Sequence, residues 1–116
     1  MVDVKPSFDQ KYLLLYTDST AGRLIIIDAE TGQLVRDLWG TVVDGYDHSK
    51  CCWDATGERV FATSGDGKIW VFEVSSGKVL CKLEGHEGGI RGVYWDLEAN
   101  WLVSCGYDQT VRVWSA

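Results

Sequence analysis

The chain has 116 residues, of which 46% are hydrophobic and 12% aromatic, as expected for one folded domain and not for a disordered segment. Eleven basic and 17 acidic residues give a net charge of −6, which disfavours nucleic acids and anionic membrane surfaces as partners. No stretch approaches the roughly 20 apolar residues that cross a bilayer, and no secretory leader is recognisable, so we expect an intracellular protein.

Short segments rich in β-branched and aromatic residues, separated by glycine and aspartate turns, predict an all-β fold. The 13 glycines and the single proline favour many short strands over long helices. In chain order, we expect strands at residues 2–8, 12–17, 23–27, 34–38, 50–53, 59–63, 68–74, 78–83, 90–95, 101–105 and 111–114.

One sequence unit occurs three times. A shift of 42 residues superposes Trp53-Asp54 on Trp95-Asp96, and a shift of 45 superposes Phe8-Asp9 on Trp53-Asp54. A period of about 40–45 residues accommodates four strands with tight turns and is typical of β-propeller blades. We therefore expect a partial ring of about three four-stranded antiparallel blades, at residues 2–40, 46–84 and 90–116.

The last unit carries Gly85-His86, Ser104, Asp108 and Trp114, spaced as Gly-His, then Ser-x-x-x-Asp-x-x-Val-x-Val-Trp. This arrangement closely resembles the signature of the WD-repeat family. The resemblance implies that His86, Ser104, Asp108 and Trp114 form a buried hydrogen-bonded network that fixes the turns of this blade. Such a network is structural, because buried polar groups need partners.

The other two units lack this network. The middle unit has Asp44 at the histidine position, Ala62 at the serine position and Phe72 at the tryptophan position, and the first has Ala21 at the aspartate position. We therefore expect these blades to be held by apolar packing alone and to have looser turns.

A narrower resemblance rests on residues 24–29 and 66–69 and on the longer, Gly-His-free connection at residues 39–48. In these features the chain resembles the C-terminal blades of the nuclear WD-repeat subunit of COMPASS histone methyltransferase and transcription-termination complexes. This resemblance implies a nuclear scaffold, related to chromatin or transcription, and places the chain in the nucleus rather than the cytoplasm.

The same residues support an enzymatic function less well than a structural network. Ser104, His86 and Asp108 are the residue types of a hydrolase triad, but Ser104 falls within a strand and no Gly-x-Ser-x-Gly elbow surrounds it. Residues 65–68 lack the full Walker pattern and the helix that should follow it. We expect no catalytic residue and no cofactor.

The cysteines and His48 do not form a convincing metal site. Adjacent cysteines on a strand point to opposite faces, so Cys51 and Cys52 cannot easily share an ion with His48. No Cys-x-x-Cys spacing occurs, and Cys51, Cys52, Cys81 and Cys105 lie in apolar stretches. We expect all four to be reduced core residues.

The expected function is a non-catalytic protein-protein interaction scaffold within a multi-subunit complex. The alternatives are a propeller-type enzyme or ligand-binding module, or a structural filler without a surface function.

By resemblance, WD proteins bind peptides through residues just after the histidine position and just before the turn aspartate. These positions hold Arg91 and Tyr107 in the last blade, and Ser49 and Gly65 in the middle one. Arginine and tyrosine are favoured at interfaces, so Arg91 and Tyr107 are the candidate partner-binding residues.

Eleven strands are one short of three complete blades, and the absent strand is the outer one of the last blade. In closed WD propellers the N-terminal segment supplies that strand, and rings have about four to eight blades. We therefore expect the chain to need the remainder of a longer propeller, or a second copy giving six blades, to complete its ring.

Overall fold

The computed structural model describes residues 3–17, 23–38, 50–64, 68–84, 90–106 and 109–115. These residues form three antiparallel sheets. The first contains β1 (Asp3–Pro6), β2 (Tyr12–Tyr16), β3 (Leu24–Asp28) and β4 (Leu34–Leu38), in that order. The second contains β5 (Cys51–Trp53), β6 (Arg59–Thr63), β7 (Ile69–Glu73) and β8 (Val79–Leu83), and the third β9 (Ile90–Asp96), β10 (Trp101–Gly106) and β11 (Val111–Ser115). The predicted all-β fold, with a three-stranded last sheet, is confirmed.

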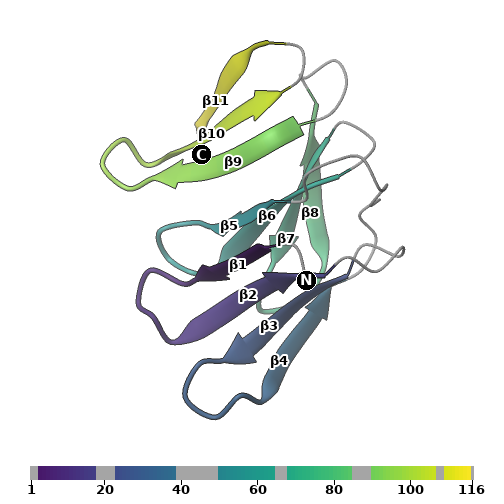
Figure 1. The fold of residues 1–116 in the computed structure, drawn as a ribbon, viewed down its shortest axis with the longest axis vertical. Helices are drawn as coiled ribbons and strands as arrows, with labels where there is room; N and C mark the ends of the chain where they lie inside the picture. The colour runs from purple at the N-terminus through teal and green to yellow at the C-terminus, as the bar shows by residue number, and fades with distance from the viewer. Residues whose placement is uncertain are drawn as a thin grey trace.

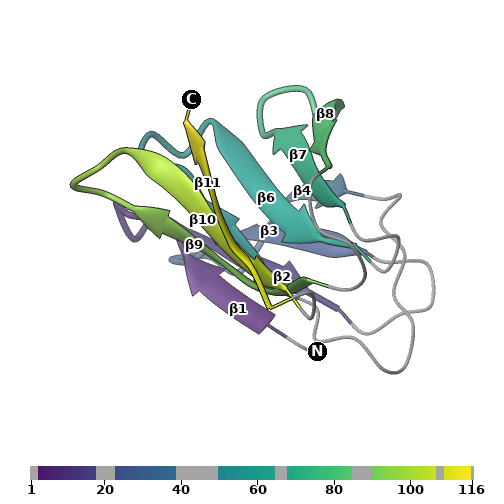
Figure 2. The ribbon, with the colours of Figure 1, turned by 90° about the horizontal axis from the view of Figure 1, so that it is seen from above.

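The three sheets stack face to face in chain order (Figure 1). The first strands of the sheets, β1, β5 and β9, are neighbours in the stack, as the blades of a propeller require. Strands alternate their side chains between two faces, so each sheet can bury one row against the preceding sheet and another against the following sheet. Figure 2 looks down on the β9–β11 sheet at the end of the stack.

Two hydrophobic clusters fill the spaces between the sheets. The first joins β1–β4 to β5–β8 and includes Leu14, Ile26, Trp53 and Phe72, all at most 2% exposed. The second joins β5–β8 to β9–β11 and includes Phe61, Val71, Trp95 and Leu102. Packing between neighbouring sheets therefore provides the core, because no single sheet can bury both of its faces alone.

The first sheet is offset from its expected alignment. The amide of Ser7 donates to the carbonyl of Tyr12 (2.8 Å), as the amide of Asp54 donates to that of Arg59 (3.1 Å). Ser7, and not Asp9, is thus the counterpart of Asp54. At this hairpin the first and second units are therefore related by a shift of 47 residues. Further along, Leu24 and Ile69 are equivalent and keep the expected shift of 45. The connection between β2 and β3 is two residues longer than that between β6 and β7. The expected superposition of Phe8 on Trp53 was therefore wrong, and Pro6 occupies that position.

The first two sheets are held by more than apolar packing, contrary to our expectation. Tyr16 donates its hydroxyl to the carbonyl of Thr63 (2.6 Å), and the Trp53 indole donates to the carbonyl of Lys5 (3.0 Å). The Arg36 guanidinium also donates across this seam, the contact between the first and second sheets, to the carbonyls of Val74 and Ser75. These bonds could not be expected from the WD signature, because Tyr16, Trp53 and Arg36 are not among its polar positions.

Trp53 and Trp95 occupy equivalent positions but differ in polar pairing. Both are at most 4% exposed, yet the Trp95 indole N–H has no acceptor in the part of the chain that the structure describes. A Trp53→Phe change should cost about 2 kcal/mol more than Trp95→Phe, since only the first breaks a hydrogen bond and the second removes a buried orphan donor. Urea unfolding of both variants, followed by far-UV circular dichroism, measures the difference. Equal destabilisation would contradict the pairing.

The four cysteines fall into two classes. Cys51 and Cys52 are buried, as expected, but Cys81 and Cys105 are exposed, so the expectation of four core cysteines was wrong for these two. Cys81 lies on β8 and Cys105 on β10, and each of these strands has exposed residues. The apolar sequence around the two cysteines does not show this exposure. Burial raises the pKa of Cys52 to about 12, and burial followed by the Asp3 carboxylate raises the pKa of Cys51 well above its usual range.

These pKa shifts predict a loss of stability in alkali. Because the unfolded chain releases thiol protons at lower pH than the folded one, the free energy of unfolding should fall between about pH 9 and pH 12, by up to about 1.4 kcal/mol per pH unit for each buried thiol. Cys52→Ala should flatten this slope relative to the wild type. In native protein at pH 8, a thiol reagent should modify Cys81 and Cys105 and spare the buried pair. An unchanged slope in Cys52→Ala would contradict the assignment.

Candidate functional site

The last sheet contains half of the hydrogen-bonded network expected from the sequence. Ser104 on β10 is 1% exposed, and its hydroxyl oxygen accepts the indole N–H of Trp114 on β11 at 3.0 Å. His86 and Asp108 lie outside the described residues, so their participation stays a prediction. A buried hydroxyl that accepts from an indole is not presented to a substrate, which argues against Ser104 as a nucleophile.

One of the two candidate partner-binding residues lies in the described part of the last sheet. Arg91 is the second residue of β9, and Tyr107 follows directly after β10 but lies outside the described residues. Because Ile90 pairs with Gly106, the start of β9 lies beside the end of β10. The roles of Arg91 and Tyr107 in binding stay predictions.

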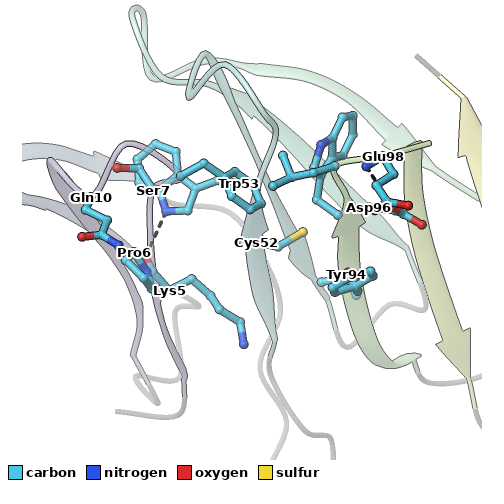
Figure 3. Close-up of a pocket in the computed structure, with 13 residues that line it drawn as sticks. Lys5, Pro6, Ser7, Gln10, Cys52, Trp53, Tyr94, Asp96 and Glu98 are labelled. Atoms are coloured by element: carbon cyan, nitrogen blue, oxygen red, sulfur yellow. Dashed lines mark hydrogen bonds between the residues drawn. The ribbon is translucent and has the colours of Figure 1, made fainter. Parts of the chain in front are cut away.

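A pocket of about 860 Å³ lies at the opposite ends of these strands, where β1, β5 and β9 lead into their first turns. Figure 3 shows Cys52 and Trp53 of β5 at its centre, between Lys5 and Gln10 on one side and Tyr94 and Glu98 on the other. Three of its apolar side chains are exposed: Phe8 (44%), Tyr94 (62%) and Leu97 (53%). Exposed apolar groups gathered around a concave surface are typical of a binding site.

The charged groups of this pocket are partly engaged within the chain. The Lys5 ammonium lies 3.5 Å from the Asp3 carboxylate. The Asp96 carboxylate accepts the backbone amides of Glu98 (3.0 Å) and Ala99 (3.3 Å), which orders the β9–β10 turn. Burial raises the pKa of the Cys52 thiol at the base to about 12, so this thiol stays protonated well into the alkaline range. The pocket thus offers apolar contact and a mixed polar rim, and its thiol is unsuited to nucleophilic chemistry.

Sequence reasoning missed this pocket, although a signal existed. Phe8 and Leu97 are large apolar residues within the turns that follow β1 and β9, where polar residues are usual. Within the described ranges, no three histidine, cysteine, aspartate or glutamate side chains are grouped to hold a metal ion. Nor does the described part of the chain contain a helix long and apolar enough to cross a membrane.

Comparison with known proteins gives a family match for the last unit. Residues 77–115 match the family model for the WD domain, G-beta repeat. A 61-residue segment is 33% identical to WD repeat-containing protein 1 of Gallus gallus and covers 50% of this chain and 10% of that protein. An 89-residue segment, 77% of this chain, is 28% identical to Protein HIR1 of Cryptococcus neoformans and 25% identical to a Chromatin assembly factor 1 subunit of Mus musculus. These matches span 10% and 15% of the two proteins, so the chain corresponds to a small part of its relatives.

Proposed function

We propose that this chain, whose residues 77–115 form a WD repeat, is a non-catalytic scaffold for protein–protein interactions within a multi-subunit complex. The observation that supports this function best is the pocket at the ends of β1, β5 and β9, with its exposed Phe8, Tyr94 and Leu97. Rigid stacked sheets hold these residues in fixed relative positions, which reduces the entropic cost of binding a partner.

The proposal extends to chromatin and to the nucleus. Similarity to the Chromatin assembly factor 1 protein, over 77% of this chain, supports a chromatin-related complex. The narrower resemblance to the COMPASS component stays a prediction. The net charge of −6 favours protein partners over nucleic acid, since phosphate contacts need clustered basic side chains.

We expect two separate binding regions on this scaffold. Arg91 lies near the start of β9, and the pocket with Leu97 lies at the other end of that strand. Tyr107 is grouped with Arg91 by its position in the sequence, directly after β10. A scaffold of this kind binds different partners at its two ends, so substitutions at the two ends should remove different proteins.

Affinity capture from nuclear extract, quantified by mass spectrometry, tests this function. Leu97→Lys should deplete one group of proteins, and Arg91→Ala and Tyr107→Ala should deplete another. Leu80→Lys is the matched control, because Leu80 is similarly exposed (49%) but lies on β8, away from both regions. Nuclease treatment should leave the captured set unchanged. If neither end alters that set in folded protein, the proposed scaffold role is wrong.

A further inference from the structure

The pocket at the ends of β1, β5 and β9 carries more negative than positive charge. Asp96 and Glu98 line it from the β9 side, and Figure 3 shows them opposite Lys5. The Lys5 ammonium lies 3.5 Å from the Asp3 carboxylate, so its charge is balanced within the chain. Among the described residues, no lysine or arginine forms an ion pair with Asp96 or Glu98. The pocket is therefore suited to a positively charged ligand.

The equivalent carboxylate of the middle sheet has a cation of its own. Asp54 pairs with the Arg59 guanidinium at 3.2 Å, in addition to its bonds with nearby backbone amides. The shift of 42 residues places Asp96 at the position of Asp54, and Trp101 at the position of Arg59. Asp96 likewise accepts two backbone amides of its turn, but Trp101 has no charge to offer. The last sheet thus keeps the carboxylate of this turn without the cation that accompanies it in the middle sheet.

The Trp95 indole is a second, independent indication of a ligand. Trp53 and Trp95 both line the pocket, and the Trp53 N–H donates to the carbonyl of Lys5 at 3.0 Å. Trp95 is only 4% exposed, and its N–H has no acceptor in the described part of the chain. A buried donor without a partner costs free energy, so a ligand that brings an acceptor is favoured. A peptide brings such an acceptor with the carbonyl of every residue.

Two exposed apolar side chains add a contact surface beside these polar groups. Phe8 is 44% exposed in the turn after β1, and Leu97 is 53% exposed in the turn after β9. All the residues that line the pocket belong to β1, β5, β9 or these two turns. The site is therefore formed within this chain, whatever lies beyond its first and last sheets. Its composition fits a ligand that combines an apolar group with a cation.

We propose that this pocket binds a peptide segment of a partner protein in which a lysine or arginine lies next to an apolar residue. The cation pairs with Asp96 and Glu98, as a guanidinium pairs with the equivalent carboxylate of the middle sheet. The apolar side chain contacts Phe8 and Leu97, and a backbone carbonyl of the peptide accepts the Trp95 N–H. This inference rests on the proposed scaffold function and names the class of partner that its pocket binds.

A selection of random heptapeptides displayed on phage, with the full chain as target, tests the class of ligand. The wild type should enrich peptides in which lysine or arginine adjoins a leucine, isoleucine, valine, methionine or phenylalanine. Fluorescence anisotropy of the most enriched peptide then gives its Kd. Binding should weaken when the ionic strength rises from about 0.1 M to about 1 M, because the Debye length falls from about 10 Å to about 3 Å. Enrichment of acidic or uncharged peptides, or of none, would overturn the proposal.

Conservative variants test the two carboxylates. Asp96→Asn and Glu98→Gln should each weaken binding of the selected peptide roughly 5-fold, because each removes one charge and little volume. An asparagine can still accept the backbone amides of the turn, so the fold is retained. Glu30→Gln is the matched control, since Glu30 is an exposed carboxylate outside the pocket, and its Kd should equal that of the wild type. Equal affinities in all three variants would contradict the pairing.

A cation placed within the chain should compete with the peptide. Trp101→Arg gives the last sheet the arginine that the middle sheet has at this position, so the new guanidinium should pair with Asp96 and weaken peptide binding roughly 5-fold. Trp101→Leu is its control, because it removes the indole without adding charge. Equal affinities of these two variants would show that Asp96 is not the partner of the cation.

Failure of this inference can be distinguished from failure of the scaffold function. If Leu97→Lys alters the proteins captured from nuclear extract but the selected peptides lack basic residues, the scaffold function stands and the basic peptide class is wrong. If basic peptides are selected and depend on Asp96 and Glu98, but no captured protein changes, the ligand class stands and the scaffold function is wrong.

Discussion

The Phe72→Ala variant is expected to lose about 4 kcal/mol of folding free energy, a large part of the 5–15 kcal/mol typical of a whole domain. Phe72 is 0% exposed and lies in the cluster that joins the first two sheets, 6.2 Å from the ring of Trp70. Both sheets contribute side chains to this cluster, so neither can collapse into the cavity without moving the other. Urea unfolding at pH 7, followed by circular dichroism, measures the loss.

Leu80→Ala is the control for this variant. Leu80 lies on the neighbouring strand β8 but is 49% exposed, so its truncation should cost less than about 1 kcal/mol. Similar losses in the two variants would show that the seam between the first two sheets does not carry the stability of the chain.

The Asp54→Ala variant is expected to lose about 3 kcal/mol, since it removes a buried carboxylate with several charge-assisted bonds. Asp54 is 2% exposed and accepts the amide of Gly57 (2.8 Å) and the hydroxyl of Thr56 (3.1 Å). It also pairs with the Arg59 guanidinium at 3.2 Å. These bonds close the β5–β6 hairpin, so its loss should weaken the whole middle sheet.

Asp96→Ala provides a matched comparison, because Asp96 occupies the equivalent turn of the last sheet. Its carboxylate accepts only the nearby amides of Glu98 and Ala99 among the described residues, and it is less buried than Asp54. We expect a loss of about 1 kcal/mol in the same unfolding experiment. Equal losses from the two aspartates would mean that burial and the Arg59 ion pair contribute nothing.

The sequence predicted the strands well because their signals are local. The strands at 34–38 and 59–63 have the predicted bounds, and the others differ by at most two residues at either end. Alternation and turn residues act over four to eight positions, which a single sequence reveals. The repeat likewise predicted three sheets, because each unit carries the same pattern.

The errors concern relations between units. The placement of Phe8 at the Trp53 position was wrong because two extra residues between β2 and β3 compensate for a two-residue offset in the first hairpin. The exposure of Cys81 and Cys105 depends on which sheet covers their faces, and the hydrogen bond from Tyr16 to Thr63 joins residues 47 positions apart. Hydropathy and spacing contain no information about such partners. The pocket was missed because three units contribute to it: the apolar Phe8 and Leu97 stand out in their turns, but the sequence does not show that these turns meet.

Among the described residues, the two contacts between neighbouring sheets differ in polar bonding, so the sheets should open separately. Between β1–β4 and β5–β8, hydrogen bonds from Tyr16, Trp53 and Arg36 add to the apolar cluster. Between β5–β8 and β9–β11, Phe61 stacks on Trp95 at 5.7 Å, but the Trp95 N–H is left without an acceptor among the described residues. Amide hydrogen exchange should therefore separate two cooperative units, with β9–β11 exchanging first and the other two sheets protected together.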